Sequence, residues 1–181
     1  PFTLQQALQN PVRDTNRIVL PPASYMHEKE KVERRWPAAV KFIQERKLNE
    51  FFDGDLTDIG IITQGGMYNG VVRALERLGL ADVWGQTRVP IYCMNVAYPM
   101  VPEEIVAFCA ESDRVLVVEE GQPAFIEDAV QAALRRAEAN SVKVHGKDML
   151  PLGGEYTGEV VLNGISAFVG RIEEVQSIKA L

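Results

Sequence analysis

Residues that could bind a ligand or assist a reaction lie within or just after four apolar segments of this 181-residue chain. If these segments are parallel strands of one sheet, their carboxyl ends meet at one edge, where α/β proteins form crevices. The residue types in question are amide, phenol, carboxylate, imidazole and ammonium side chains beside a glycine pair. The candidate crevice or interface residues are Gln64, Gly65, Gly66, Tyr68, Asn69, Asn95, Tyr98, Glu119, Glu120, His145 and Lys147, with Thr63 and Asp148 beside them.

The glycine pair Gly65–Gly66 lies in the stretch DIGIITQGGMYNG at 58–70, which predicts a strand, a tight turn and a helix. Backbone N–H groups at such a turn could bind an anion. However, the spacing G-G-x-x-x-G matches neither the dinucleotide fingerprint nor a P-loop, and no Lys follows Gly70. A plain tight turn is therefore favoured. A free-standing α/β module that binds a small anionic ligand at this turn is the alternative function.

Two polar groups near the expected strand ends have both a chemical and a structural interpretation. Glu119 and Glu120 could supply a general acid or base, but carboxylates after a strand also cap helices and contact neighbouring chains. His145 and Lys147 form a polar cluster in a turn. Residue types and spacing alone reveal no convincing catalytic set, and we assign no catalytic residue.

Metal and cofactor motifs are not apparent in the sequence. The two cysteines, Cys93 and Cys109, lie in apolar segments, where a thiol usually acts as a small buried hydrophobic group. His27 is far from His145 in the sequence, so two histidines and two such cysteines give no metal signature. We therefore assign no metal-binding or cofactor-binding residue to this chain.

Composition limits the partners and the compartment that the chain can have. A formal net charge of -6 argues against nucleic acid, because little of the surface could neutralise phosphates. No apolar run approaches the roughly 20 residues that cross a bilayer, and no secretory pattern opens the chain. We expect a cytoplasmic protein without a membrane partner. The start at Pro1 suggests a piece of a longer protein.

The order of predicted elements indicates an α/β fold. We expect strands at 59–62, 90–96, 114–118 and 142–145. Helices are expected after the glycine turn up to Gly79, from Pro102, from Pro123, and from about 158 to 178. This alternation predicts a three-layer α/β/α domain with a mostly parallel sheet of about four to five strands.

The segment before the first predicted strand is expected to form two arms. Several prolines make 1–25 a connecting arm, in which 18–20 could be a short edge strand or an extended linker. A helical arm follows at 26–56, kinked or divided at Pro37 and ending in a loop at 49–57. The α/β domain then occupies 57–181.

Three ordered stretches together carry a resemblance to a known family. They are DIGIITQGGMYNGVVRALERLGL, NVAYPMVPEEIVAFCAESDRVLVVEEGQPAFIEDAV and VKVHGKDMLPLGGEYT. In this order they resemble the transketolase C-terminal-like domain of indolepyruvate:ferredoxin oxidoreductases, which belong to the thiamine-pyrophosphate-dependent 2-oxoacid:ferredoxin oxidoreductases. The resemblance covers about 58–157, and RIVLPPASYMHEK resembles the family's entry into this domain.

The resemblance implies a parent enzyme that oxidatively decarboxylates an aryl 2-oxoacid to the acyl-CoA and passes electrons to ferredoxin. Thiamine pyrophosphate, Mg and iron-sulfur clusters would be its cofactors, and ferredoxin, CoA and other domains or subunits its partners. The family's diphosphate motif G-D-G is not matched by Asp53–Gly54–Asp55, and two separated cysteines do not supply cluster ligands. By this resemblance the chain alone is inactive, and it acts as a non-catalytic domain for structure and assembly.

Overall fold

A computed structural model describes residues 4–9 and 19–170 of the chain. The chain forms two compact units, Pro1–Phe42 and Ile43–Leu181. The candidate site residues all belong to the second unit. The two units are described separately.

The first unit is mostly helical where it is described. α1 (Leu4–Gln9) is followed by α2 (Ala23–Glu30), a π-helical segment (Lys31–Arg35) and α3 (Trp36–Glu45), whose end belongs to the second unit. Pro37 lies in the first turn of α3. The helix passes it without a break because the wider π turn gives space to a ring that would crowd the preceding α turn. Val19 and Leu20 form a bend rather than a strand, and Ile18 lies outside the described residues.

The second unit contains a five-stranded sheet of order β1-β3-β2-β4-β5. The strands are β1 (Glu50–Phe52), β2 (Ile59–Gln64), β3 (Ile91–Met94), β4 (Arg114–Val118) and β5 (Lys143–His145). β3, β2, β4 and β5 are parallel, with Ile62 opposite Tyr92 and Val117 in the register of β2. The predicted α/β fold with a mostly parallel sheet is confirmed.

The prediction of a loop over 49–57 is wrong for residues 50–52. Glu50–Phe52 forms the edge strand β1, which pairs antiparallel with β3 through Phe51 opposite Tyr92. Aromatic residues favour strands. A three-residue segment shows no measurable periodicity, however, so the pairing with a strand about forty residues later determines its structure. Asp53–Gly54–Asp55 follows as an irregular segment with a bend at Asp55.

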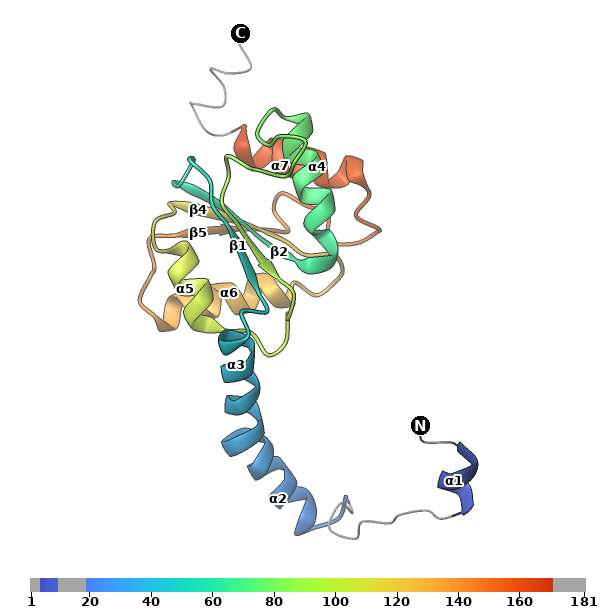
Figure 1. The fold of residues 1–181 in the computed structure, drawn as a ribbon. Coiled ribbons are helices and arrows are strands. Elements are labelled where there is room, and N and C mark those ends of the chain that lie inside the picture. Colours follow the sequence, from blue (N-terminus) through green and yellow to red (C-terminus); the bar gives the residue numbers. More distant parts are fainter. Residues whose placement is uncertain (1–3, 10–18, 171–181) are drawn as a thin grey trace. The chain divides into compact units, whose positions relative to one another are not determined.

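Helices cover both faces of the sheet. Figure 1 shows α4 (Tyr68–Arg77) and α7 (Gly158–Val169) over one face, and α5 (Pro102–Cys109) and α6 (Phe125–Arg136) over the other. Alternate residues of one strand point to opposite faces, so Ile61 packs beneath the first pair and Ile62 beneath the second. Each face thus has its own hydrophobic core, as a three-layer domain requires.

Local sequence signals mark helix boundaries near the positions that the sequence predicts. Leu78 is the C-cap of α4, and Gly79 follows with a φ of 73°. The Gly79 N–H donates to Glu76 O and the Leu80 N–H to Leu75 O, which together form a Schellman motif. Pro102 opens α5 as predicted. The last helix is observed over Gly158–Val169, and the predicted continuation over 171–178 lies outside the described residues.

Candidate functional site

A crevice of about 590 Å³ opens beyond the carboxyl ends of β2, β3 and β4. Four of the predicted residues line it: Gln64, Tyr98, Glu119 and Glu120. The remaining lining residues come from the loops after β3 and β4 and from the start of α6, namely Ala97, Met100, Gly121, Gln122, Pro123, Phe125, Ile126 and Ala129. Most of this lining is apolar. Four of the predicted residues thus meet at the strand ends, and the apolar residues of α6 that complete the lining were not predicted as part of it.

Glu119 is buried, with 4% of its surface exposed, and its carboxylate caps the start of α6. Oε1 accepts the Ile126 N–H at 2.9 Å, and Oε2 accepts the Glu127 N–H at 3.2 Å. Ala124 at the N-cap position makes no side-chain capping bond. The carboxylate therefore binds N–H groups that would otherwise lack a partner at the positive end of the helix dipole.

Lys147 connects the end of β4 with the loop that precedes α7. Its ammonium donates to the backbone oxygen of Glu119 and to the Tyr156 hydroxyl, and it also lies 4.8 Å from the centre of the Tyr156 ring. The Tyr156 hydroxyl donates to Pro151 O at 2.6 Å, and the Tyr156 N–H donates to Glu120 Oε1 at 2.7 Å. These bonds hold the rim of the crevice in one conformation.

His145 pairs with Asp148 beside this network. Nδ1 of His145 lies 2.7 Å from Oδ2 of Asp148, and the Gly146 N–H donates to the other carboxylate oxygen at 2.9 Å. Burial raises the pKa of Asp148, but the bonds from His145 and Gly146 outweigh it and hold the pKa below its ordinary value. His145 also contacts Phe168 edge to face, with ring centres 5.9 Å apart. These contacts close a turn and link it to α7.

The glycine turn contacts Asn95 rather than the crevice. Gly65 belongs to a short 3₁₀ segment (Gly65–Met67), and a Cβ atom at Gly65 would lie 2.6 Å from Asn95 Oδ1. The Asn95 amide donates to Leu48 O at 2.9 Å and to the Glu50 carboxylate at 2.8 Å. Close approach to this amide accounts for glycine at position 65. A Cβ atom at Gly66 would have no neighbour within 4 Å.

The other predicted residues lie at the start of α4. The Tyr68 ring stacks on Phe52 of β1, with ring centres 4.8 Å apart, and burial raises the pKa of its hydroxyl. Asn69 is exposed. The structure thus brings Gln64, Tyr98, Glu119 and Glu120 together at the crevice and places Tyr68, Asn69 and Asn95 around the glycine turn.

A buried polar network beneath β1 was missed by the sequence analysis. Asn49, 4% exposed, donates from its amide to Glu104 Oε2 at 2.8 Å and to the Tyr92 hydroxyl at 3.1 Å. The Tyr92 hydroxyl donates to the same carboxylate at 2.8 Å, and Asn49 Oδ1 accepts the Val96 N–H. Burial is the main cause that raises the pKa of Tyr92 far above its ordinary value, and the hydrogen bond to Glu104 adds to it. Asn49 precedes a strand that the sequence did not reveal, so no local signal marked it as buried.

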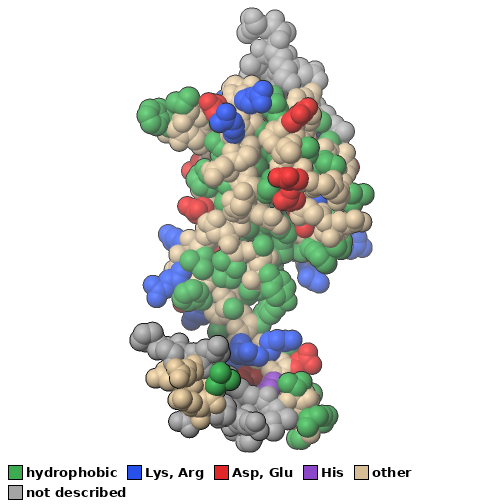
Figure 2. Space-filling model, turned by 90° about the vertical axis from the view of Figure 1, so that its right-hand side faces the viewer, with side chains coloured by type: hydrophobic (Ala, Val, Ile, Leu, Met, Phe, Trp, Pro, Cys, Tyr) green, Lys and Arg blue, Asp and Glu red, His purple; other side chains and the backbone are tan. Residues whose placement is uncertain are grey.

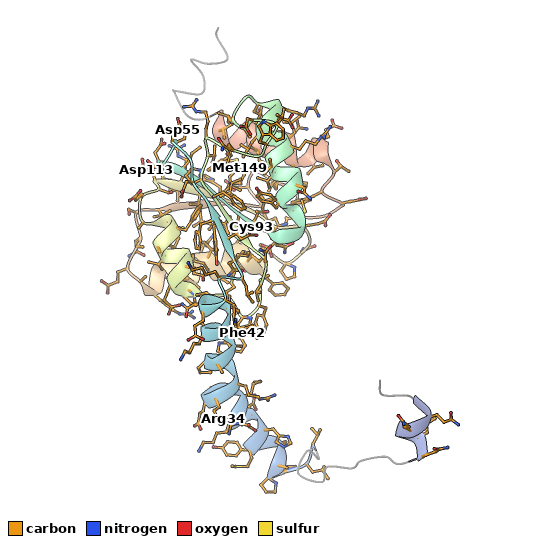
Figure 3. All side chains as sticks on the ribbon, in the orientation of Figure 1. Arg34, Phe42, Asp55, Cys93, Asp113 and Met149 are labelled. Carbon is orange, nitrogen blue, oxygen red and sulfur yellow. The ribbon has the colours of Figure 1, made fainter. Side chains whose placement is uncertain are left out.

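The cysteines do not suit an iron-sulfur cluster. Cys93 lies on β3 within the sheet (Figure 3), Cys109 lies at the end of α5, and both are buried and unpaired with another cysteine. Burial raises the pKa of Cys109 to about 12 and also raises that of Cys93, whereas cluster ligation requires thiolates grouped in space. Within residues 4–9 and 19–170 no three His, Cys, Asp or Glu side chains gather closely enough to hold a metal ion.

The surface around the sheet carries charges of both signs. Figure 2 shows a face on which hydrophobic side chains lie between scattered acidic and basic groups. Figure 3 places Asp55 and Asp113 at the amino end of the parallel strands, opposite the crevice.

In the part of the chain that the structure describes, no helix is both long and apolar enough to span a membrane.

Comparison with known proteins finds similarity to one group of oxidoreductases. The chain is 32% identical over 163 residues to the indolepyruvate oxidoreductase subunit IorA of Methanothermobacter thermautotrophicus, covering 87% of this chain and 25% of that protein. It is 34% identical over 137 residues to the IorA subunit of Methanothermobacter marburgensis, covering 75% of this chain and 20% of that protein. The chain thus spans about a quarter or less of the length of these relatives.

One solved structure shows the same fold at lower identity. A 2-oxoglutarate:ferredoxin oxidoreductase from Magnetococcus marinus superposes with a TM-score of 0.53 and 19% identity, covering 83% of this chain and 24% of that one. The inactive β4 tetramer of a split-gene transketolase gives a TM-score of 0.47 at 18% identity, covering 66% of this chain and 40% of that one.

The family follows from a sequence profile. The profile of the indolepyruvate oxidoreductase domain matches residues 50–165, more than half of the chain. The matched region begins with β1 and includes all five strands as well as α4, α5 and α6. The resemblance that the sequence motifs indicate is confirmed: the chain belongs to the indolepyruvate oxidoreductase domain family.

Proposed function

We propose that this chain is a non-catalytic assembly domain, of the transketolase C-terminal type, in an indolepyruvate:ferredoxin oxidoreductase. The parent enzyme oxidatively decarboxylates aryl 2-oxoacids to acyl-CoA with ferredoxin as electron acceptor. The observation that carries the proposal is the family match over 50–165 in a chain that covers a quarter of its IorA relative. In the proposed enzyme the remaining length supplies the reaction centre.

The contacts at the strand ends support an architectural role. Glu119 caps α6, Lys147 binds a backbone oxygen and a tyrosine hydroxyl, and Asn95 ties the turn after β3 to β1. Each of these groups stabilises the domain through intramolecular bonds. A general acid or base, by contrast, has to reach a substrate and exchange a proton with it.

The proposed cofactors and partners of the parent enzyme are those that the resemblance implies. Thiamine pyrophosphate, Mg and iron-sulfur clusters bind to other domains or subunits, and ferredoxin and CoA bind to the whole enzyme. This chain contributes a rim at the carboxyl ends of its strands, which contacts those neighbours. In the proposed organisation, 1–25 and the helical part of 26–56 are arms that lead into the domain 57–181, to whose sheet β1 (Glu50–Phe52) adds an edge strand. The enzyme works in the cytoplasm.

Two measurements test the proposal. The parent enzyme, purified anaerobically, should reduce ferredoxin when given indolepyruvate and CoA, and aliphatic 2-oxoacids should serve less well. Titration of the 181-residue chain with thiamine pyrophosphate and Mg²⁺ in a calorimeter should give no heat of binding. Failure of indolepyruvate to support reduction would contradict the parent activity, and micromolar cofactor affinity of this chain would contradict its non-catalytic role.

A further inference from the structure

The crevice formed by β2, β3, β4 and α6 combines apolar walls with acidic side chains. Its volume of about 590 Å³ lies within the range of roughly 300–1,000 Å³ that is usual for binding pockets. Two aromatic lining residues are largely exposed, Tyr98 at 77% and Phe125 at 70%. Large exposed apolar groups around a concavity are typical of surfaces that bind a partner.

The charged side chains that line the crevice are acidic, and the Lys147 ammonium lies behind the lining, bonded to the backbone oxygen of Glu119. Among the described residues that line the crevice, the charged ones are Glu119 and Glu120, and neither Lys nor Arg occurs. Glu119 is buried, and both of its carboxylate oxygens accept N–H groups of α6. Glu120 is exposed, and its Oε1 accepts the Tyr156 N–H. A carboxylate has about four acceptor positions, so Glu120 can also accept hydrogen bonds from a cation.

This charge pattern discriminates between kinds of ligand. An anion such as a 2-oxoacid, a diphosphate or the phosphates of CoA would meet the exposed carboxylate of Glu120, which repels it, and no cationic side chain lines the crevice among the described residues. A ligand with an apolar group next to a cation would bury the apolar group in the crevice, and its cation would contact Glu120 at the rim. The crevice therefore suits an apolar and basic partner.

Bonds within the domain hold the groups at the rim. Glu119 fixes the start of α6, Lys147 holds the backbone oxygen of Glu119, and the Tyr156 N–H holds Glu120. A preordered site loses little conformational entropy when it binds. The bonds that fix these groups within the domain also make them suitable for docking.

We propose that this crevice seats an apolar side chain, flanked in sequence by Lys or Arg, from another domain or subunit of the parent oxidoreductase. The inference rests on the proposed function, because it takes the partner from the remainder of that enzyme. The chain covers 25% and 20% of its two IorA relatives, so the parent contains a large further length of polypeptide that can supply such a segment.

Photo-crosslinking in the assembled parent enzyme tests the proposal. Phe125→p-benzoylphenylalanine places a reactive group on the wall of the crevice, and peptide mapping identifies what it touches. We expect an adduct with a segment outside this chain in which an apolar residue lies within a few positions of Lys or Arg. An adduct with a segment lacking a basic residue, with a small molecule or with a second copy of this chain would overturn the proposal, as would the absence of an adduct.

A charge series provides the matched test. Glu120→Lys should reduce the adduct yield at least about tenfold, because it places a cation against the partner's cation, and Glu120→Gln should reduce it less. Glu76→Lys reverses an exposed carboxylate on α4 and should leave the yield unchanged. Equal yields for Glu120→Lys and Glu76→Lys would overturn the role of Glu120.

The two proposals can fail separately. If the assembled protein reduces no ferredoxin with any 2-oxoacid, but position 125 crosslinks to an apolar and basic segment, the parent activity is wrong and the docking site stands. If the enzyme is active and position 125 crosslinks to no apolar and basic segment, the docking proposal is wrong and the proposed parent activity stands.

Discussion

The carboxylate of Glu119, directly after β4, accepts the backbone N–H of Ile126 at 2.9 Å and so joins the end of the strand to the start of α6. The loop between them forms part of the crevice wall. One buried side chain thereby sets both the position of a helix and the shape of the candidate site.

Removal of this cap should destabilise the domain. Glu119→Ala should lower the free energy of unfolding by about 1–3 kcal/mol, because two N–H groups at a helix start lose their partner. Urea unfolding followed by circular dichroism measures the change. Glu111→Ala, which truncates an exposed carboxylate after α5, is the control and should alter stability by less than about 0.5 kcal/mol. A Glu119 variant as stable as this control would show that the cap contributes nothing.

The two adjacent glycines of the turn should respond differently to alanine. Gly65→Ala should cost about 1–3 kcal/mol, because the new methyl group would lie 2.6 Å from Asn95 Oδ1 and displace the amide that ties this turn to β1. Gly66→Ala should be nearly neutral, since the added atom meets no neighbour within 4 Å. Thermal unfolding of the two variants gives the comparison, and equal melting temperatures would contradict it.

Tyr92 should make stability depend on alkaline pH. Burial and the bond to Glu104 raise its pKa in the folded chain. Its contribution is therefore complete below the unfolded pKa of about 10 and declines as pH rises above that value. Tyr92→Phe should flatten the loss of stability above about pH 10. An unchanged alkaline slope in denaturant titrations of the variant would show that Tyr92 is not the cause.

Asp148 should make the stability of the fold depend on acidic pH. Although burial raises its pKa, the bonds from His145 and Gly146 hold the folded value below the ordinary one. Its stabilisation is present above the unfolded pKa of about 3.9 and is lost as pH falls through the lower folded value. Asp148→Asn should therefore make stability less sensitive to pH below about 4. If acid unfolding of the variant followed the wild-type curve, the pair with His145 would not be responsible.

The cysteines should be inert in the folded chain. Burial raises the pKa of Cys93 and that of Cys109, the latter to about 12, so little thiolate is present near neutral pH. Labelling with iodoacetamide at pH 8 should be at least about a hundredfold slower than in urea, because it requires transient opening. Rapid modification of the native chain at either thiol would contradict the assigned burial.

The strand-helix alternation and its breakers were sufficient to predict most of the fold. The apolar run at 114–118, the glycine turn after β2 and the helix starts at Pro102 and Pro123 are local signals, and each predicted the nearby element. β1 could not be predicted in this way. Its three residues become a strand through distant pairing with β3, and the burial of Asn49 depends on that pairing.

The sequence predicts that the candidate residues lie at strand ends, but it does not predict which of these groups bind one another. Parallel strands bring Gln64, Tyr98 and Glu119 to one edge, and this topological rule needs no side-chain detail. Which groups bind one another is decided by packing: Glu119 faces α6, whereas Asn95 faces the glycine turn. The apolar side of the crevice at Phe125 and Ala129 follows from the orientation of α6, which the sequence pattern does not specify.

The turnover number of the assembled parent enzyme with indolepyruvate tests the central claim most directly. It should be measured per intact, cofactor-loaded complex, for the wild type and for Glu120→Gln and Lys147→Met in this domain. An assembly domain predicts turnover within about threefold of wild type once the complex has formed, since loss of a general acid or base usually costs about a hundredfold or more. A hundredfold loss in a fully assembled and loaded complex would contradict the account.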